Sequence, residues 1–223
     1  MDKVFFIFGS SSFIAKKLFQ EIKKDFEVYG FSRKKLSIKN NFKINYNDDK
    51  YLEIISNKLK NKKPVFIFSN AISDKKILIN SKKNDIEKII KINLLTPINI
   101  TRKILKKYIY KKPSFLYFSS SRGFNGDKGI SIYSASKNGL EGFVRSSATE
   151  YGSLEIIFRT IHLGLFDGGL KETELSKKKV DEILFRTANK KYVENNNLKN
   201  TIYFASEDIA GNGSYIKCDN GFF

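Results

Sequence analysis

Short apolar runs alternate along this chain with longer stretches whose apolar residues recur at helical spacing. Residues 4–8 form an apolar run with the length of a buried strand, and residues 13–24 then carry apolar side chains on one helical face. The same alternation predicts further strands at residues 26–31, 42–46, 65–68 and 115–118, within 154–163, and at 214–217. It predicts further helices at residues 51–59, 85–110, 133–151 and 198–206.

Strands that alternate with helices build βαβ units. The expected fold class is therefore α/β, with a doubly wound parallel sheet of about seven strands and helices on both faces. The helical stretch 85–110 contains Pro97, which lacks a backbone N–H and predicts a kink or break near Thr96. No repeat, low-complexity linker or shift in composition divides the chain. We therefore expect a single domain over residues 1–223.

Composition narrows the class of protein. A chain of 223 residues with 41% hydrophobic residues can bury a full core and is too apolar to be disordered. No apolar run approaches the ~18 residues of a membrane span, and the short run before Gly9 is typical of a strand rather than of a signal peptide. The single cysteine, Cys218, excludes an internal disulfide framework and a multi-cysteine zinc site. These features predict a cytoplasmic protein without a metal or a membrane segment.

The net charge of +18 raises the question of nucleic acid as a partner. The basic residues are spread along the chain rather than gathered in one tail, and no zinc-finger or RNA-binding motif accompanies them. Specific nucleic-acid binding is therefore not predicted. A basic surface that favours anionic substrates is the simpler interpretation, and binding to nucleic acid that disappears at moderate salt would fit it.

The segment between the first strand and the first helix is a candidate phosphate-binding turn. Gly9 permits a tight turn, and the serines after it add hydroxyl donors beside the free N–H groups of a helix start. The second and third glycines of the usual nucleotide-binding turn are absent, and Phe13 and Ala15 stand in their places. An ordinary serine-capped helix is the alternative. The candidate cofactor-binding residues here are Gly9, Ser11, Ser12, Phe13 and Ile14.

The end of the second strand bears on the choice of cofactor. NAD-selective sites place an acidic residue about 20 residues after the glycine turn, where it holds the ribose 2′-hydroxyl, whereas NADP sites accommodate a 2′-phosphate with a basic residue. This chain has no acid at that point but has Ser32 and Arg33, followed by two lysines. We therefore expect NADP as the preferred cofactor and NAD as the second choice. A basic turn without a cofactor role is the competing interpretation.

Tyr133 and Lys137 are four residues apart in the helix expected over residues 133–151, so both side chains lie on one face. A tyrosine with an ordinary pKa of about 10 is a poor acid or base at neutral pH. A neighbouring ammonium stabilises the phenolate and lowers that pKa, so the pair can donate a proton to a carbonyl or accept one from an alcohol. An exposed pair without any role would have the same spacing.

These motifs resemble those of the classical short-chain dehydrogenases/reductases, and the resemblance runs from end to end of the chain. Tyr133-x-x-x-Lys137 matches the active-site motif of that family. Ser120, which precedes Tyr133 at a strand end, matches its catalytic serine, and Asn93 matches its helix asparagine. The order and spacing of the matches identify the family more strongly than any single motif.

Further matches extend the resemblance to the cofactor side of the site. Asn70 and Ala71 keep the centre of the family's Asn-Asn-Ala-Gly strand end, and Gly164 keeps the glycine of the Pro-Gly that follows the sixth strand. The resemblance adds Asn70, Ala71, Gly164 and Phe166 to the cofactor-binding candidates, together with Ser32, Arg33, Tyr133 and Lys137. The C-terminal Asp219-Asn220-Gly221 is similar to the Asp-Gly-Gly ending of the family.

The resemblance implies a Rossmann-like fold, with a cofactor half at about residues 1–112 and a catalytic and substrate half at about residues 113–223. It also implies an oxidoreductase in which the nicotinamide delivers a hydride to a carbonyl carbon. Ser120 would orient the carbonyl oxygen, and Tyr133 would protonate it. Lys137 would lower the tyrosine pKa and hold the nicotinamide ribose, while Asn93 would organise a water path that restores the proton.

The implied substrate is a small-molecule carbonyl or alcohol. A 3-oxoacyl group on an acidic carrier protein suits the basic surface, a sugar or other polar carbonyl is comparable, and a bulky apolar ketone is less favoured. The polar stretch 170–191 lies where the family closes over its substrate, but it carries no substrate signature. His162, the single histidine, is expected to have a structural role rather than to transfer protons.

The resemblance further implies a homodimer or homotetramer, with the helices around Asn93 and Tyr133 at one interface. An alternative from a different class remains open. A non-catalytic dinucleotide-binding or scaffold protein would fit the eroded glycine motif, whereas the complete set of catalytic residues argues against it.

Overall fold

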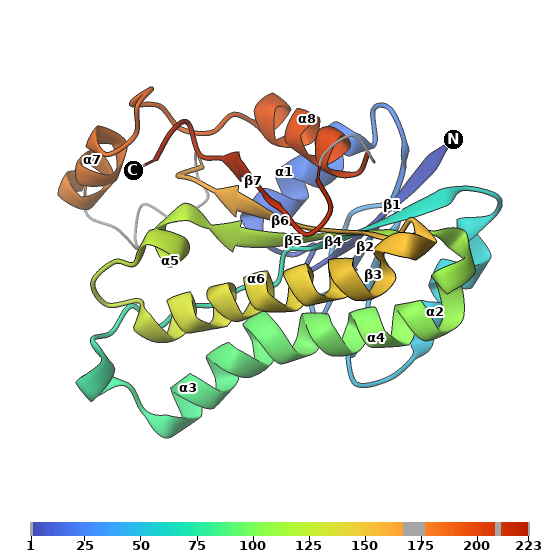
Figure 1. Ribbon diagram of the computed structural model, residues 1–223, viewed down its shortest axis with the longest axis horizontal. Helices are drawn as coiled ribbons and strands as arrows, with labels where there is room; N and C mark the ends of the chain where they lie inside the picture. Colours follow the sequence, from blue (N-terminus) through green and yellow to red (C-terminus); the bar gives the residue numbers. More distant parts are fainter. Residues whose placement is uncertain (1, 167–176, 208–210, 223) are drawn as a thin grey trace.

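Seven parallel strands form one sheet in the order β3-β2-β1-β4-β5-β6-β7 (Figure 1). The computed structural model describes residues 2–166, 177–207 and 211–222. The chain winds outward from β1 to β3 and then returns to build the other half from β4, so the strand order reverses between β1 and β4. This arrangement confirms the expected doubly wound α/β fold. The strands are β1 (Lys3–Phe8), β2 (Glu27–Ser32), β3 (Asn41–Lys43), β4 (Lys63–Phe68), β5 (Ser114–Ser120), β6 (Ile157–Leu163) and β7 (Tyr215–Cys218).

Helices cover both faces of the sheet (Figure 1). One face carries α1 (Phe13–Ile22) and α8 (Asn195–Ala205), and the other carries α2 (Lys50–Leu59), α4 (Thr96–Tyr108) and α6 (Ser131–Tyr151). The remaining helices are α3 (Lys83–Ile90), α5 (Ser121–Asn125) and α7 (Lys177–Phe185). The short α5 is absent from the sequence-based prediction. Among the described residues, no helix has the length and apolar character needed to cross a membrane.

The expected break near Thr96 takes the form of a widened turn. A π-helical turn, Lys91–Leu95, joins α3 directly to α4. The Thr96 N–H donates to the Lys91 carbonyl, and the Thr96 hydroxyl donates to the same oxygen at 2.7 Å. The wider turn accommodates Pro97, which has no N–H to give and whose ring crowds the preceding turn. Asn93 lies inside this turn and is fully buried.

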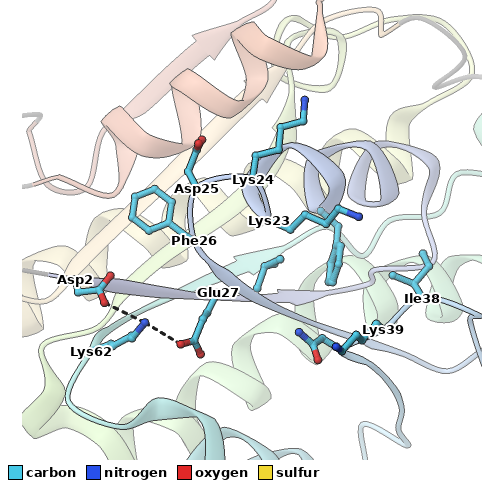
Figure 2. A pocket seen from close by; sticks show the side chains of 12 residues that line it. Asp2, Lys23, Lys24, Asp25, Phe26, Glu27, Ile38, Lys39 and Lys62 are labelled. Atoms are coloured by element: carbon cyan, nitrogen blue, oxygen red, sulfur yellow. Dashed lines mark hydrogen bonds and ion pairs between the residues drawn. The ribbon is translucent and has the colours of Figure 1, made fainter.

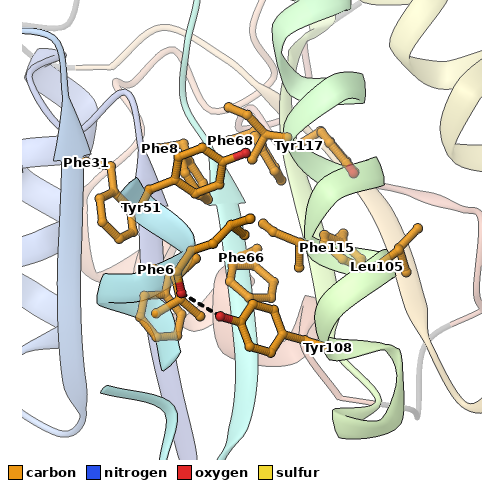
Figure 3. Close-up of a cluster of buried hydrophobic side chains, with 14 of the residues drawn as sticks. Phe6, Phe8, Phe31, Tyr51, Phe66, Phe68, Leu105, Tyr108, Phe115 and Tyr117 are labelled. Atoms are coloured by element: carbon orange, nitrogen blue, oxygen red, sulfur yellow. Dashed lines mark hydrogen bonds between the residues drawn. The ribbon is translucent and has the colours of Figure 1, made fainter. Parts of the chain in front are cut away.

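Stacked aromatic rings fill one face of the sheet (Figure 3). Parallel strands in register bring side chains of the same face side by side, and Phe6, Phe66, Phe115 and Phe158 consequently form one row. Their neighbouring ring centroids are 5.3, 5.4 and 4.9 Å apart. A second row, toward the carboxyl ends of the strands, consists of Phe31, Phe8, Phe68 and Tyr117. Both rows tie the central strands together and so fix the strand ends that carry the site.

Candidate active site

A cavity of about 450 Å³ lies at the carboxyl ends of the central strands. Its walls come from the turn after β1, the segments after β4, β5 and β6, and the beginning of α6. The predicted catalytic residues Ser120, Tyr133 and Lys137 line it. The predicted cofactor-binding residues that line it are Ser12, Phe13, Ile14, Ala71, Gly164 and Phe166. Residues that are far apart in the sequence therefore meet at the edge where open α/β sheets bind ligands.

The remaining predicted residues are not among those that line this cavity. They are Gly9, Ser11, Ser32, Arg33, Asn70 and Asn93. The stretch 170–191, expected to close over substrate, lies partly outside the described residues, and its described part forms α7 and the segment that follows.

Ser120 and Tyr133 meet across the break between β5 and α6. Ser120 ends β5 and caps α5, since its Oγ accepts the Gly123 N–H at 3.3 Å. Tyr133 lies in the first turn of α6, and its phenol lies beside the Ser120 side chain in the wall of the cavity. A Cβ atom at Gly123 would lie 3.2 Å from Cε1 of Tyr133, so glycine at that position leaves room for the ring.

Lys137 lies one turn further along α6 and is only 2% exposed. Its Nζ donates to the Phe118 carbonyl at 2.6 Å and lies 5.7 Å from the centroid of the Tyr133 ring. Burial lowers the pKa of Lys137 to about 8, because an ammonium loses its hydration in the interior.

Burial also raises the pKa of Tyr133, and the polar Ser120 side chain and the charge of Arg122 offset only part of that rise. The sequence argument expects the opposite direction, since it considers the neighbouring ammonium but not the desolvation of the phenol. Tyr133 is therefore protonated at neutral pH, which is the state that a proton donor requires.

Asn93 connects three segments behind the cavity. Its Oδ1 accepts the Ile72 N–H at 2.9 Å, and its Nδ2 donates to the Ile72 carbonyl at 2.9 Å and to the Ser136 hydroxyl at 3.0 Å. Ser136 in turn donates to the Tyr133 carbonyl at 2.7 Å. The amide thus ties the π-helical turn to the segment after β4 and to the first turn of α6.

Gly9 holds the turn after β1 against the end of β4. Its φ is +81°, and a Cβ atom there would lie 2.8 Å from the Asn70 backbone nitrogen. The Gly9 N–H lies within hydrogen-bonding reach of the Phe31 carbonyl at 2.9 Å and the Tyr46 hydroxyl at 3.0 Å. Glycine is therefore required here both for backbone conformation and for space.

The beginning of α1 follows this turn. Ser12 caps the helix by accepting the Ala15 N–H at 3.1 Å, and its hydroxyl lies 2.8 Å from that of Ser69. Phe13, which stands where a glycine is usual, has a ring that is 40% exposed and lies beneath the Lys17 ammonium, 5.6 Å away. Ala15 is fully buried, as close packing of helix against strand requires.

Ser32 and Arg33 lie at the end of β2, beside the Gly9 turn. Ser32 is buried, and its hydroxyl donates to the Lys34 carbonyl at 2.5 Å. Arg33 is exposed, and its charge acts on the buried Tyr46 phenol. This pair occupies the strand end at which nucleotide-binding folds bind the 2′-phosphate of the adenosine ribose.

Sequence reasoning missed several polar residues around the cavity. Lys75 and Arg122 line it, and Arg122 pairs with Asp127 at 2.6 Å. Both follow predicted strand ends, which is the signal that would have found them. Glu141, one turn after Lys137, is buried, and an acid at an inward position of that helix was the corresponding signal.

A second cavity, of about 570 Å³, lies at the opposite edge of the sheet (Figure 2). Lys62 pairs with two acids of the same wall, Asp2 at 3.0 Å and Glu27 at 2.9 Å. None of the predicted site residues lies in its wall. The cavity at the carboxyl edge is therefore the candidate active site.

Comparison with known proteins places this architecture in context. A family model described as short chain dehydrogenase matches residues 7–179. The 3-oxoacyl-(acyl-carrier-protein) reductase FabG of Buchnera aphidicola is 28% identical over 222 residues, which cover 93% of this chain and 88% of the relative. Two solved structures share the fold. "ElxO with NADP Bound" has a TM-score of 0.81 at 21% identity, and "4-hydroxyisoleucine dehydrogenase complexed with NADH" has a TM-score of 0.81 at 19% identity, each match covering 99% of this chain and 98% of the other.

Proposed function

The chain belongs to the short-chain dehydrogenase family, and from that premise we propose that it is an NAD(P)-dependent oxidoreductase acting on a carbonyl or alcohol substrate. The observation that carries the proposal is the meeting of Ser120, Tyr133 and Lys137 in one cavity, with the phenol beside the serine side chain and the buried Lys137 ammonium 5.7 Å from the centroid of the phenol ring. Residues 1–112 form the cofactor half in this proposal, and residues 113–223 form the catalytic and substrate half.

The residues of the carboxyl edge fit a dinucleotide. Gly9 leaves a turn with no room for a side chain at the beginning of α1, where a diphosphate is stabilised by backbone N–H groups and the helix dipole. Ser32 and Arg33 would hold the 2′-phosphate of NADP, and Gly164 and Phe166, which line the cavity, would contact the nicotinamide. When bound, the cofactor supplies the hydride. NADP is the preferred cofactor, and NAD is the alternative.

The chain's own residues supply positioning and the proton. The Ser120 hydroxyl donates a hydrogen bond to the substrate carbonyl oxygen, and the Tyr133 phenol transfers its proton to that oxygen as the alcohol forms. The Lys137 ammonium stabilises the phenolate that remains and holds the nicotinamide ribose. Asn93 keeps the Ile72 backbone and Ser136 in place behind Tyr133. In this proposal it also organises the water path that returns a proton to the phenolate.

The wall of the cavity favours an anionic or carrier-bound substrate. Among the described residues, the charged side chains in this wall are Lys75, Arg122 and Lys137, all basic. A 3-oxoacyl group on an acidic carrier protein and a polar or sugar carbonyl both fit this charge, and the first is also the substrate class named for the FabG relative.

A homodimer or homotetramer is part of the proposal. The groove between α4 and α6 is lined by apolar Leu105, Ile109 and Phe143 and by charged side chains of both signs, and this mixed lining supports an interface there.

Parallel titrations of NADPH and NADH, followed by the fluorescence of the reduced nicotinamide, test this function. The wild-type protein is expected to bind NADPH more tightly than NADH. Arg33→Ser is expected to weaken NADPH binding about tenfold and to leave NADH binding unchanged, because one charge-assisted contact with the 2′-phosphate is lost. A carbonyl panel with NADPH then measures turnover.

The outcomes separate the alternatives. Tighter binding of NADH would overturn the assignment of Arg33 but not the oxidoreductase. Binding without turnover of any carbonyl would favour a dinucleotide-binding scaffold, and the absence of binding at sub-millimolar concentration would exclude the proposed enzyme.

A further inference from the structure

A buried acid–imidazole pair lies behind Lys137, and the catalytic assignment does not use it. Glu141 follows Lys137 by one helical turn on α6 and is 4% exposed. Two residues of β6 hold its carboxylate, since Oε1 lies 2.7 Å from His162 Nε2 and Oε2 accepts the Thr160 hydroxyl at 2.6 Å. Both oxygens are thus fixed by the sheet rather than by solvent.

The surroundings of His162 decide which member of this pair carries charge. The imidazole is fully buried, stacked on the Tyr215 ring at 4.5 Å and in contact with the Phe124 ring at 4.9 Å. Its Nδ1 has no hydrogen-bond partner within the part of the chain that the structure describes. An imidazolium would bury an N–H at Nδ1 without an acceptor, so the neutral ring with its proton on Nε2 fits the site. His162 then donates to Glu141, and Glu141 is the anion.

The carboxylate remains ionised although it is buried. Burial opposes its ionisation, but the hydrogen bonds from His162 and Thr160, together with the electrostatic effect of the imidazole, hold the pKa of Glu141 below its ordinary value. A charged acid in the interior requires a counter-charge, and the buried ammonium of Lys137 is one helical turn away. The charge of Glu141 acts on Lys137 in the direction that keeps the ammonium protonated.

Other groups around Lys137 do not replace this acid. On α6 the neighbour is the Tyr133 phenol, which is neutral at pH 7, and on β5 it is the Phe118 carbonyl. Arg122 of α5 adds positive charge near Tyr133. Asp219, after β7, accepts a hydrogen bond from the Ser121 hydroxyl, so its carboxylate is bonded to Ser121 rather than to Lys137.

We propose that Glu141, oriented by His162 and Thr160, is a positioning residue that keeps the Lys137 ammonium protonated and thereby sets the alkaline limit of carbonyl reduction. The first part concerns the protein alone, and only the second part rests on the proposed function. His162 acts as a hydrogen-bond donor to the carboxylate and does not exchange protons with the substrate. Two opposite charges in a medium of low dielectric stabilise each other strongly, so neutralising one removes that support from the other.

The test measures the titration of Lys137 without cofactor or substrate. The protein is labelled with an amine-reactive acylating reagent across a pH series, and mass spectrometry of the peptide that contains Lys137 gives the pH of half-maximal labelling. Glu141→Gln is expected to lower that midpoint by about 1 unit or more relative to the wild type. Glu150→Gln, which removes an exposed acid from the same helix, is the matched control and is expected to leave the midpoint unchanged.

A second readout is the pH profile of kcat/KM for carbonyl reduction. The alkaline limb of the wild type is expected at about pH 8, where Lys137 loses its proton, and Glu141→Gln is expected to move it to lower pH while activity at pH 6 is retained. The single variant His162→Gln, which keeps an N–H donor for the carboxylate, is expected to retain a pH profile close to that of the wild type. Thr160→Val removes one hydrogen bond only, and it is expected to cause a smaller shift in the same direction as Glu141→Gln.

The results separate this inference from the proposed function. An unchanged Lys137 midpoint in folded Glu141→Gln would overturn the inference, and so would an equal shift in Glu150→Gln. If Glu141→Gln does not fold, an unchanged midpoint in Thr160→Val would overturn it in the same way. A shifted midpoint in a protein that reduces no carbonyl would support the inference about Lys137 and overturn the proposed function instead.

Discussion

The two cavities at opposite edges of the sheet differ in what surrounds their charges. The cavity at the amino edge is the larger, at about 570 Å³ against about 450 Å³. One of its lysines, Lys62, has a side chain that is 19% exposed and pairs with Asp2 and Glu27, whose side chains are 65% and 35% exposed. At the carboxyl edge Lys137 is 2% exposed and bonded to a backbone carbonyl. The volume of a cavity therefore does not identify the candidate active site. Buried polar side chains gathered around the smaller cavity do.

Exposure decides what these charges can do. Water and salt screen an ion pair at the surface, and each of its groups stays charged at neutral pH. The Lys62 ammonium titrates above its usual range because its hydrogen bonds with Glu27 and Asp2 stabilise the charged form. Burial moves the pKa of Lys137 the other way, to about 8, and places its titration within reach of the working pH.

The largest effect is expected when the phenol hydroxyl at the carboxyl edge is removed. Tyr133→Phe is expected to lower kcat for carbonyl reduction about 10²- to 10⁴-fold, because the proton donor is lost. NADPH binding should change little, and steady-state kinetics beside the fluorescence titration measures both. Tyr110→Phe, at a side chain that is 69% exposed, is the matched control. Retention of most of the activity in Tyr133→Phe would assign the proton to another group.

The second-largest effect is expected when a side chain is added in the turn at Gly9. Gly9→Ala is expected to cost about 1–3 kcal/mol of unfolding free energy, because φ is +81° and the new Cβ would crowd the Asn70 backbone. NADPH affinity should fall with it, since the turn can no longer lie against β4. Gly126→Ala is the control, because Gly126 has a φ of +82° but nothing within 4 Å of the added atom.

Urea denaturation and NADPH titration of the two alanine variants separate conformation from space. Equal losses in both variants would show that φ alone matters and that the contact with Asn70 does not.

The smallest effect is expected at the amino edge. Lys62→Met breaks both ion pairs of the larger cavity, and it is expected to leave NADPH binding and kcat unchanged and to lower the melting temperature only slightly. Differential scanning fluorimetry measures the melting temperature, steady-state kinetics measures kcat, and the fluorescence titration measures NADPH binding. A loss of activity comparable to that of Tyr133→Phe would mean that the amino edge takes part in function and that exposure is a poor criterion.

Local sequence was sufficient where one element carries the whole signal. The apolar runs at residues 4–8 and 115–118 predicted strands that became β1 and β5, since buried parallel strands are apolar on both faces. The spacing of Tyr133 and Lys137 predicted a shared helix face, because the α-helical period is a local property.

Local sequence was insufficient where the answer depends on a neighbour in space. The pKa of Tyr133 rises because the fold buries the phenol, and no spacing rule contains that burial. Asn93 holds the Ile72 backbone only because a π-helical turn carries its amide toward the segment after β4. The carboxylate of Glu141 meets His162 only when α6 packs on β6.

By itself, then, the sequence determined the order of strands and helices, the family resemblance and the residue types available for chemistry, because periodicity and spacing are properties of the chain. The tertiary structure alone decided which of two cavities gathers those residues and which charges are removed from water. It also decided in which direction each pKa moves. Desolvation and hydrogen bonding depend on atoms brought together from distant parts of the chain, and that is why these properties exist only in the folded protein.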